Sequence, residues 1–105
     1  MSIIVNISDY TKTPGARFKS DGPFSGEEFR EKILDPHFND KSAKEKIEII
    51  LDGVEGYPTS FLEEAFGGLA RKYGKERCLE RIEFVSEENP LLIKEIQYYI
   101  EESGG

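Results

Sequence analysis

The sequence contains no tryptophan and only one cysteine, one methionine and one histidine. With Cys78 alone, neither an internal disulfide nor a Cys-based zinc cluster can form, so we expect this residue to be a small core hydrophobe. The single histidine, His37, has Asp35 and Asp40 nearby in the sequence, whereas a metal site needs three or four converging ligands. We therefore expect a surface histidine, no metal site and no other cofactor.

Long apolar runs are also missing. Nothing approaches the roughly 18 apolar residues of a membrane span, and the start, MSIIVNIS, lacks the basic lead and apolar stretch of a signal peptide. We predict a cytoplasmic protein that does not associate with membranes. The 21 acidic and 14 basic side chains give a formal net charge of −7, which repels nucleic acid phosphates. Glutamates interrupt the only basic cluster, so we predict no nucleic acid partner; that cluster comprises Arg71, Lys72, Lys75, Arg77 and Arg81.

Catalytic motifs are missing as well. No P-loop, no GxGxxG after a strand, no HExxH and no GxSxG occurs. Nucleophilic catalysis by a serine needs a base within hydrogen-bond reach. An enzyme would require Ser25, His37 and Ser60 to converge in one cleft, and because nothing in the sequence indicates this, we expect no enzymatic activity.

The pattern that is present alternates strands with helices over 105 residues, the length of one domain. It predicts strands at 2–7, 47–51 and 81–85, a short strand at 16–20, and helices at 26–34, about 60–73 and 90–102. Ser25 with Glu28, and Ser60 with Glu63, have the spacing of capping boxes. We predict an α/β fold with a mostly parallel sheet of about four strands and about three helices, frayed at 103–105. The apolar run at 47–51 is typical of a strand covered on both faces.

The most informative stretch is the loop between the strand at 47–51 and the next helix. Asp52-Gly53, Gly56 and Pro58 are turn residues, and this loop leaves the carboxyl end of a strand, where open α/β sheets bind ligands. Either Ser60 or Thr59 caps the helix, and the role of Ser60 is either capping only or that of a site for phosphate, bound or covalent. Since Glu63 and Glu64 already place negative charge in the first turn, a phosphoryl group would act on docking rather than on helix stability.

The segments GAR (15–17), SGEEFR (25–30) and TSFLEEAFGG (59–68) resemble the STAS-like family of unknown function DUF4325, related to the STAS domains of bacterial anti-sigma factor antagonists. The resemblance covers most of the chain and implies a single STAS-like domain spanning 1–105. It implies that Ser60 stands where the antagonists are phosphorylated, with Thr59 before it. Pro58 and Phe61 depart from that pattern, which has Asp and Gly there.

Two functional hypotheses follow. The first is a small regulatory module that binds a protein partner, with Phe61 as an apolar anchor and possible phosphorylation of Ser60 for release; the resemblance implies a GHKL-type ATPase or anti-sigma kinase as partner. Its predicted contact residues are Gly56, Tyr57, Thr59, Ser60, Phe61, Glu63 and Glu64. The alternative is a domain that binds a small anion or nucleotide at the same helix N-terminus, assisted by Arg17 and by Ser25. A Phe61 that projects into solvent beside an open loop favours the first hypothesis, and a Phe61 buried beneath a pocket that reaches the N–H groups at the helix start favours the second.

Overall fold

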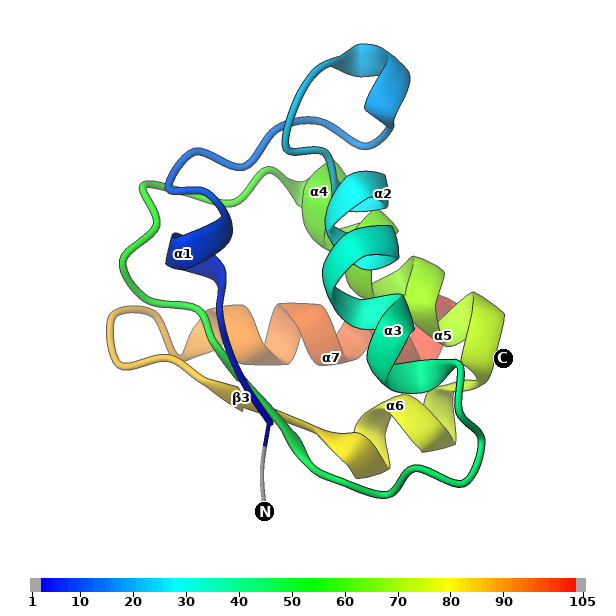
Figure 1. Ribbon diagram of the computed structural model, residues 1–105. Helices are drawn as coiled ribbons and strands as arrows, with labels where there is room; N and C mark the ends of the chain where they lie inside the picture. The colour runs from blue at the N-terminus through cyan, green and yellow to red at the C-terminus, as the bar shows by residue number, and fades with distance from the viewer. Residues whose placement is uncertain (1–2, 104–105) are drawn as a thin grey trace.

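The computed structural model describes residues 3–103 (Figure 1). Its elements follow in the order β1 (Ile3–Asn6), α1 (Ile7–Tyr10), η1 (Lys19–Asp21), α2 (Gly26–Phe29), η2 (Arg30–Leu34), α3 (Asp35–Phe38), β2 (Ile47–Ile50), α4 (Thr59–Leu62), η3 (Glu63–Gly67), α5 (Gly68–Tyr73), α6 (Lys75–Arg81), β3 (Ile82–Val85) and α7 (Leu91–Ser103). The predicted first strand is confirmed from Ile3 to Asn6, and Ser2 lies outside the described residues. Ser103 ends α7, while the rest of the tail expected to fray, 104–105, lies outside them too.

The sheet of the described chain has three strands in the order β1-β2-β3, all parallel. Ile3 pairs with Ile47, which pairs with Ile82. The α/β class and the parallel sheet are confirmed, but the predicted fourth strand at 16–20 is wrong. The carbonyls of Ala16 and Arg17 accept hydrogen bonds from the backbone N–H groups of Gly26 and Glu27, at 2.9 and 3.0 Å. Ala16 and Arg17 therefore satisfy free amides at the start of α2 instead of pairing with the sheet, and Lys19 and Ser20 belong to the short helix η1.

All the large helices lie on one side of the sheet, which Figure 1 shows nearly edge-on. Crossovers between neighbouring parallel strands are almost always right-handed, and because the strands are added in one direction, two such crossovers fall on the same face. On β2, Ile47 and Ile49 are fully buried beneath the helices, whereas Glu48 and Ile50 on the opposite face are half-buried. The expectation that this strand is covered on both faces is wrong for the described chain.

The first long helix runs from Gly26 to Phe38, through the proline expected to end it. Its middle, η2, is a wide π-helical turn in which the N–H of Asp35 donates to the carbonyl of Arg30, five residues back. A proline ring normally clashes with the carbonyl four residues earlier. The wider turn gives Pro36 room, and the helix continues for one more turn.

The second long helix runs from Thr59 to Tyr73 and also contains a π-helical turn, η3. It ends at Gly74, whose φ of 96° suits glycine, as predicted. A further helix, α6, follows at once and was not predicted; it carries Cys78, which is fully buried as expected. A Cβ atom on Gly26 would lie 2.4 Å from the carbonyl oxygen of Phe61, so this glycine sets the close approach of the two long helices.

The core lies between the helical layer and the sheet. Aromatic rings form its centre. The ring centroid of Phe29 lies 5.7 Å from that of Phe61 and 6.1 Å from that of Phe66, and the ring centroids of Phe66 and Phe84 lie 5.2 Å apart. From α7, Ile96 and Ile100 are fully buried, which confirms the predicted inner face of that helix. Among residues 3–103, no helix combines the length and apolar character needed to cross a bilayer.

Candidate functional site

The loop after β2 is fastened to the loop after β3 through Asp52. Its carboxylate accepts hydrogen bonds from the N–H groups of Glu87 and Glu88, at 2.8 and 3.1 Å, and from the hydroxyl of Ser86 at 3.1 Å. These donors, the Glu87 amide first, lower the pKa of Asp52. In return, Glu88 accepts a bond of 3.0 Å from the N–H of Gly53. These hydrogen bonds therefore hold the two loops at the carboxyl edge of the sheet against each other.

Tyr57 holds the second half of the same loop. Its hydroxyl donates to the carbonyl of Leu51 at 2.8 Å, and its ring packs 6.2 Å from that of Phe61. Burial, with the nearby charge of Asp52, raises the pKa of this phenol. Gly56 beside it is exposed. The loop is therefore exposed at Gly56, while the side chain of Tyr57 packs against the core and the N–H of Glu55 donates to the carbonyl of Lys12 at 2.9 Å.

Ser60 is not a helix cap. The helix begins at Thr59, the N-cap is Pro58, and no side chain bonds to the cap position. The predicted capping box of Ser60 with Glu63 is therefore wrong, because Pro58 already provides the extended residue before the helix and the Glu63 carboxylate turns to arginines. Thr59 is exposed and Ser60 is half-buried, and the Ser60 hydroxyl makes no hydrogen bond to any described residue.

Phe61 is fully buried, in contact with the rings of Phe29 and Tyr57. The expectation that it is an exposed apolar anchor for a partner is wrong. The cause is the close approach of α2, where Gly26 lets the first long helix cover this side of α4. Phe61 therefore contributes to any binding surface only by supporting the loop above it.

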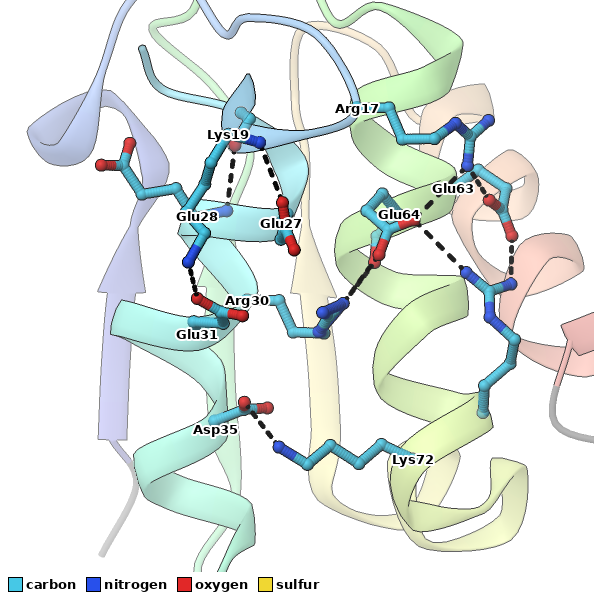
Figure 2. A network of polar contacts seen from close by, with 12 residues as sticks. Arg17, Lys19, Glu27, Glu28, Arg30, Glu31, Asp35, Glu63, Glu64 and Lys72 are labelled. Atoms are coloured by element: carbon cyan, nitrogen blue, oxygen red, sulfur yellow. Dashed lines mark hydrogen bonds and ion pairs between the residues drawn. The ribbon is translucent and has the colours of Figure 1, made fainter. Parts of the chain in front are cut away.

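The two glutamates expected to form a charged rim belong instead to an internal ion-pair network (Figure 2). Glu63 pairs with Arg17 and with Arg71, the latter at 2.5 Å, and accepts a bond of 3.1 Å from the Ser103 hydroxyl. The hydrogen bond from Arg71, reinforced by Arg17, lowers the pKa of Glu63 to about 2. This carboxylate is charged at any physiological pH and is not free to meet a partner.

Glu64 is the more buried of the two, at 8% exposure. It lies 2.9 Å from Arg30 and 3.6 Å from both Arg17 and Arg71. As Figure 2 shows, Arg30 reaches it from the first long helix, so the pair joins the two helices where their π-helical turns face each other. The expected rim role for Glu64 is wrong, and Arg17, expected to assist an anion, is already neutralised by two carboxylates.

Ser25 caps α2, as predicted. Its hydroxyl oxygen accepts a bond of 3.0 Å from the N–H of Glu28 and is fully buried. The Glu28 carboxylate does not bond back to the Ser25 N–H, as a capping box requires, but accepts bonds from the N–H of Phe24 and the hydroxyl of Tyr10. A buried capping hydroxyl does not meet an exposed anion, so the expected assistance from Ser25 is wrong.

Two of the three residues considered for a serine enzyme, Ser25 and His37, do not converge. Ser25 and His37 lie at opposite ends of one helix, about 18 Å apart at a rise of 1.5 Å per residue. Residues 3–103 contain no group of three or more histidine, cysteine or acidic side chains arranged to hold a metal ion. Of the basic cluster, Arg71 and Lys72 form ion pairs within the fold, and Arg81 is buried.

A cavity of about 320 Å³ lies between the loop after β2 and the start of α7. Gly56 and Tyr57 line it from the loop, and Leu92 lines it from the helix. It also carries four carboxylates: Asp52, Glu55, Glu88 and Glu95. Such a site attracts cations and repels anions.

Residues 25–92 match the model of a family described as a STAS-like domain of unknown function (DUF4325). The chain belongs to this family. No curated protein and no solved structure matches it. The match covers the capped start of α2, both π-helical turns and the loop after β2 of this STAS-like domain, so the resemblance carried by SGEEFR and TSFLEEAFGG is confirmed.

Two exposed apolar residues beside this site were missed. Leu91 is 70% exposed and Tyr98 is 59% exposed, and with Glu95 they share one face of α7 at spacings of four and three. The signal was available in the sequence. If Ile96 and Ile100 face inward, the helical period turns this stripe outward.

Proposed function

We propose that this STAS-like domain is a regulatory protein-interaction module whose partner binds at the carboxyl edge of the sheet. The contact surface is the exposed loop from Gly53 to Pro58 with Thr59 and Ser60, flanked by the outer stripe of α7. The observation that carries the proposal is the state of this loop. It is exposed, yet fixed by Asp52 and Tyr57, so binding does not have to order it.

The charges of the site support a protein partner over a small anion or nucleotide. Arg17, the cation expected to assist an anion, is held by Glu63 and Glu64, and the neighbouring cavity is lined by four carboxylates. A lysine or arginine side chain of a partner fits this cavity in size and charge. Leu91 and Tyr98 take over the apolar contacts that Phe61 cannot make.

We also propose that phosphorylation of Ser60 releases the partner. Ser60 shares a helix face with Glu63 and Glu64, three and four residues on. Both carboxylates are paired with arginines, so their repulsion of a phosphoryl group at Ser60 is weaker than the sequence suggests. A charge of about −1.5 to −2 at a desolvating interface weakens docking. By resemblance to the antagonists, a GHKL-type ATPase or anti-sigma kinase is the proposed partner.

The test is a pull-down with quantitative mass spectrometry, using immobilised wild type, Ser60→Asp and the double variant Leu91→Ala/Tyr98→Ala. The matched control is Ser42→Asp, an exposed serine in the connector that enters β2 at the opposite edge of the sheet. We expect one protein to be recovered with wild type and Ser42→Asp but reduced several-fold with both test variants. Equal recovery with all four proteins contradicts the proposal.

A further inference from the structure

The sheet face that points away from the helices carries an unusual set of side chains. Because side chains alternate along a strand, every second residue of each strand projects from this face. The open face consists of Ile4, Asn6, Glu48, Ile50, Glu83 and Val85. Ile4 is 64% exposed, and Figure 1 shows no described segment packed against this side. Parallel sheets are almost always covered on both faces, so a face left partly apolar indicates something that covers it.

Two carboxylates stand side by side in the middle of the open face. The register pairs Ile4 with Glu48 and Glu48 with Glu83 across the three strands. Like charges directly opposite each other destabilise a sheet. Neither glutamate forms an ion pair with a residue among 3–103. The next row pairs Asn6 with Ile50 and Ile50 with Val85, so the open face combines two unpaired carboxylates with two neighbouring aliphatic side chains and one amide.

We propose that the open face binds an amphipathic helix of a partner protein, with aliphatic side chains against Ile4, Ile50 and Val85 and a lysine or arginine between Glu48 and Glu83. The dimensions fit one helix. Three strands about 4.8 Å apart make a face about 10 Å wide, and four residues per strand make it about 13 Å long. An α-helix is about 10 Å in diameter, and two to three of its turns span this length.

A second copy of the chain fits this face less well. Stacking two open faces brings four glutamates together in chains that each carry a net charge of −7. A groove of about 440 Å³ along the free edge of β1, lined in part by Ile4, Tyr10 and Ile33, extends the apolar surface and has room for one large side chain of the helix.

The probe is a synthetic 15-residue amphipathic helical peptide of leucine, alanine and lysine, with a second peptide that has glutamate in place of lysine. The isotopically labelled full chain is titrated with each peptide and followed by NMR. We expect the lysine peptide to shift the signals of Ile4, Ile50 and Val85, and the glutamate peptide to leave them unchanged. Shifts confined to the loop at 53–58 or to α7, or no shifts at millimolar peptide, overturn the proposal.

Two double variants distinguish the effect of the Glu48 and Glu83 carboxylates from the effect of the overall negative charge of the protein. Glu48→Gln/Glu83→Gln should weaken lysine-peptide binding about 2- to 30-fold, the range for two partly exposed ion pairs. It should also raise the melting temperature by roughly 1–4 °C, because the repulsion between the strands is relieved. The control, Glu76→Gln/Glu101→Gln, removes two exposed charges elsewhere and should leave both values close to wild type. Equal weakening by both variants, or a concentration-dependent dimer of the free protein in sedimentation, contradicts the proposal.

Discussion

Replacing Glu63 with glutamine removes the negative charge that holds Arg17 and Arg71 against the second long helix. The pKa of this carboxyl falls from 4.5 to about 2 in the folded protein. Each tenfold change in acid dissociation is worth about 1.4 kcal/mol, so the full effect on stability is about 3 kcal/mol. Because the side chain is 22% exposed, solvent screens part of this, and we expect Glu63→Gln to cost about 1–3 kcal/mol at pH 7.

The sign of the pH dependence follows from the lowered pKa. The charged carboxylate stabilises the folded state fully above pH 4.5 and loses this effect as the pH falls towards 2. The difference in free energy of unfolding between wild type and Glu63→Gln should therefore fall to less than half its pH 7 value at pH 3. Urea unfolding at pH 7, 5, 4 and 3 measures it, with the exposed Glu76→Gln as the control. A difference that stays constant from pH 7 to pH 3 refutes the assignment of this ion-pair network.

Two further predictions concern the core. Gly26→Ala places a Cβ atom 2.4 Å from the carbonyl oxygen of Phe61 and should lower the free energy of unfolding by about 1–3 kcal/mol. In the control, Gly56→Ala, no atom lies within 4 Å of the new Cβ, so the free energy of unfolding should be unchanged or slightly raised. Equal effects of the two variants in urea unfolding would show that the long helices do not approach closely at Gly26. Burial raises the pKa of the Cys78 thiol to about 12, so a disulfide reagent at pH 8 should modify this thiol only after unfolding. In the control variant Thr59→Cys, the introduced, exposed cysteine should react at once. Rapid modification of Cys78 in the folded wild type would contradict its burial.

The elements that the sequence predicts best are those in which one face is strongly apolar. The helix at 59–73 and α7 follow their apolar period, and the strand at 47–50 follows its short β-branched run. Helix α6 was missed because KERCLER buries only Cys78 and Arg81 and so shows no apolar stripe. The strand expected at 16–20 failed because its backbone groups were needed by α2, a demand that local sequence does not reveal.

The site was harder to predict than the fold because its residues form ion pairs with residues that are distant in the sequence. Glu63 and Glu64 resemble first-turn glutamates that complement a helix dipole, yet their partners Arg17, Arg30 and Arg71 lie on three other segments. The sequence alone cannot distinguish a solvated carboxylate from one in such a network, because both occur at the same helical position. The burial of Phe61, in contrast, could have been predicted from the sequence. Phe61 stands four residues before Ala65 and eight before Leu69, on the edge of the apolar stripe of this helix.

The glutamate at the centre of the apolar β2 run shows where local pattern and function diverge. A strand buried on both faces would exclude the charge of Glu48, and a strand with one solvated face would not need Ile50 and Val85 beside it. The alternation fits neither case by itself, but it fits a face that is covered part of the time by a cationic, apolar surface. The two proposed binding surfaces also differ in the kind of partner that they suit. The carboxyl edge offers a fixed loop whose hydroxyl can be modified, which suits a regulated partner, whereas the open face offers only shape and fixed charge. A variant that loses binding at one should therefore keep binding at the other, because the two surfaces share no side chain.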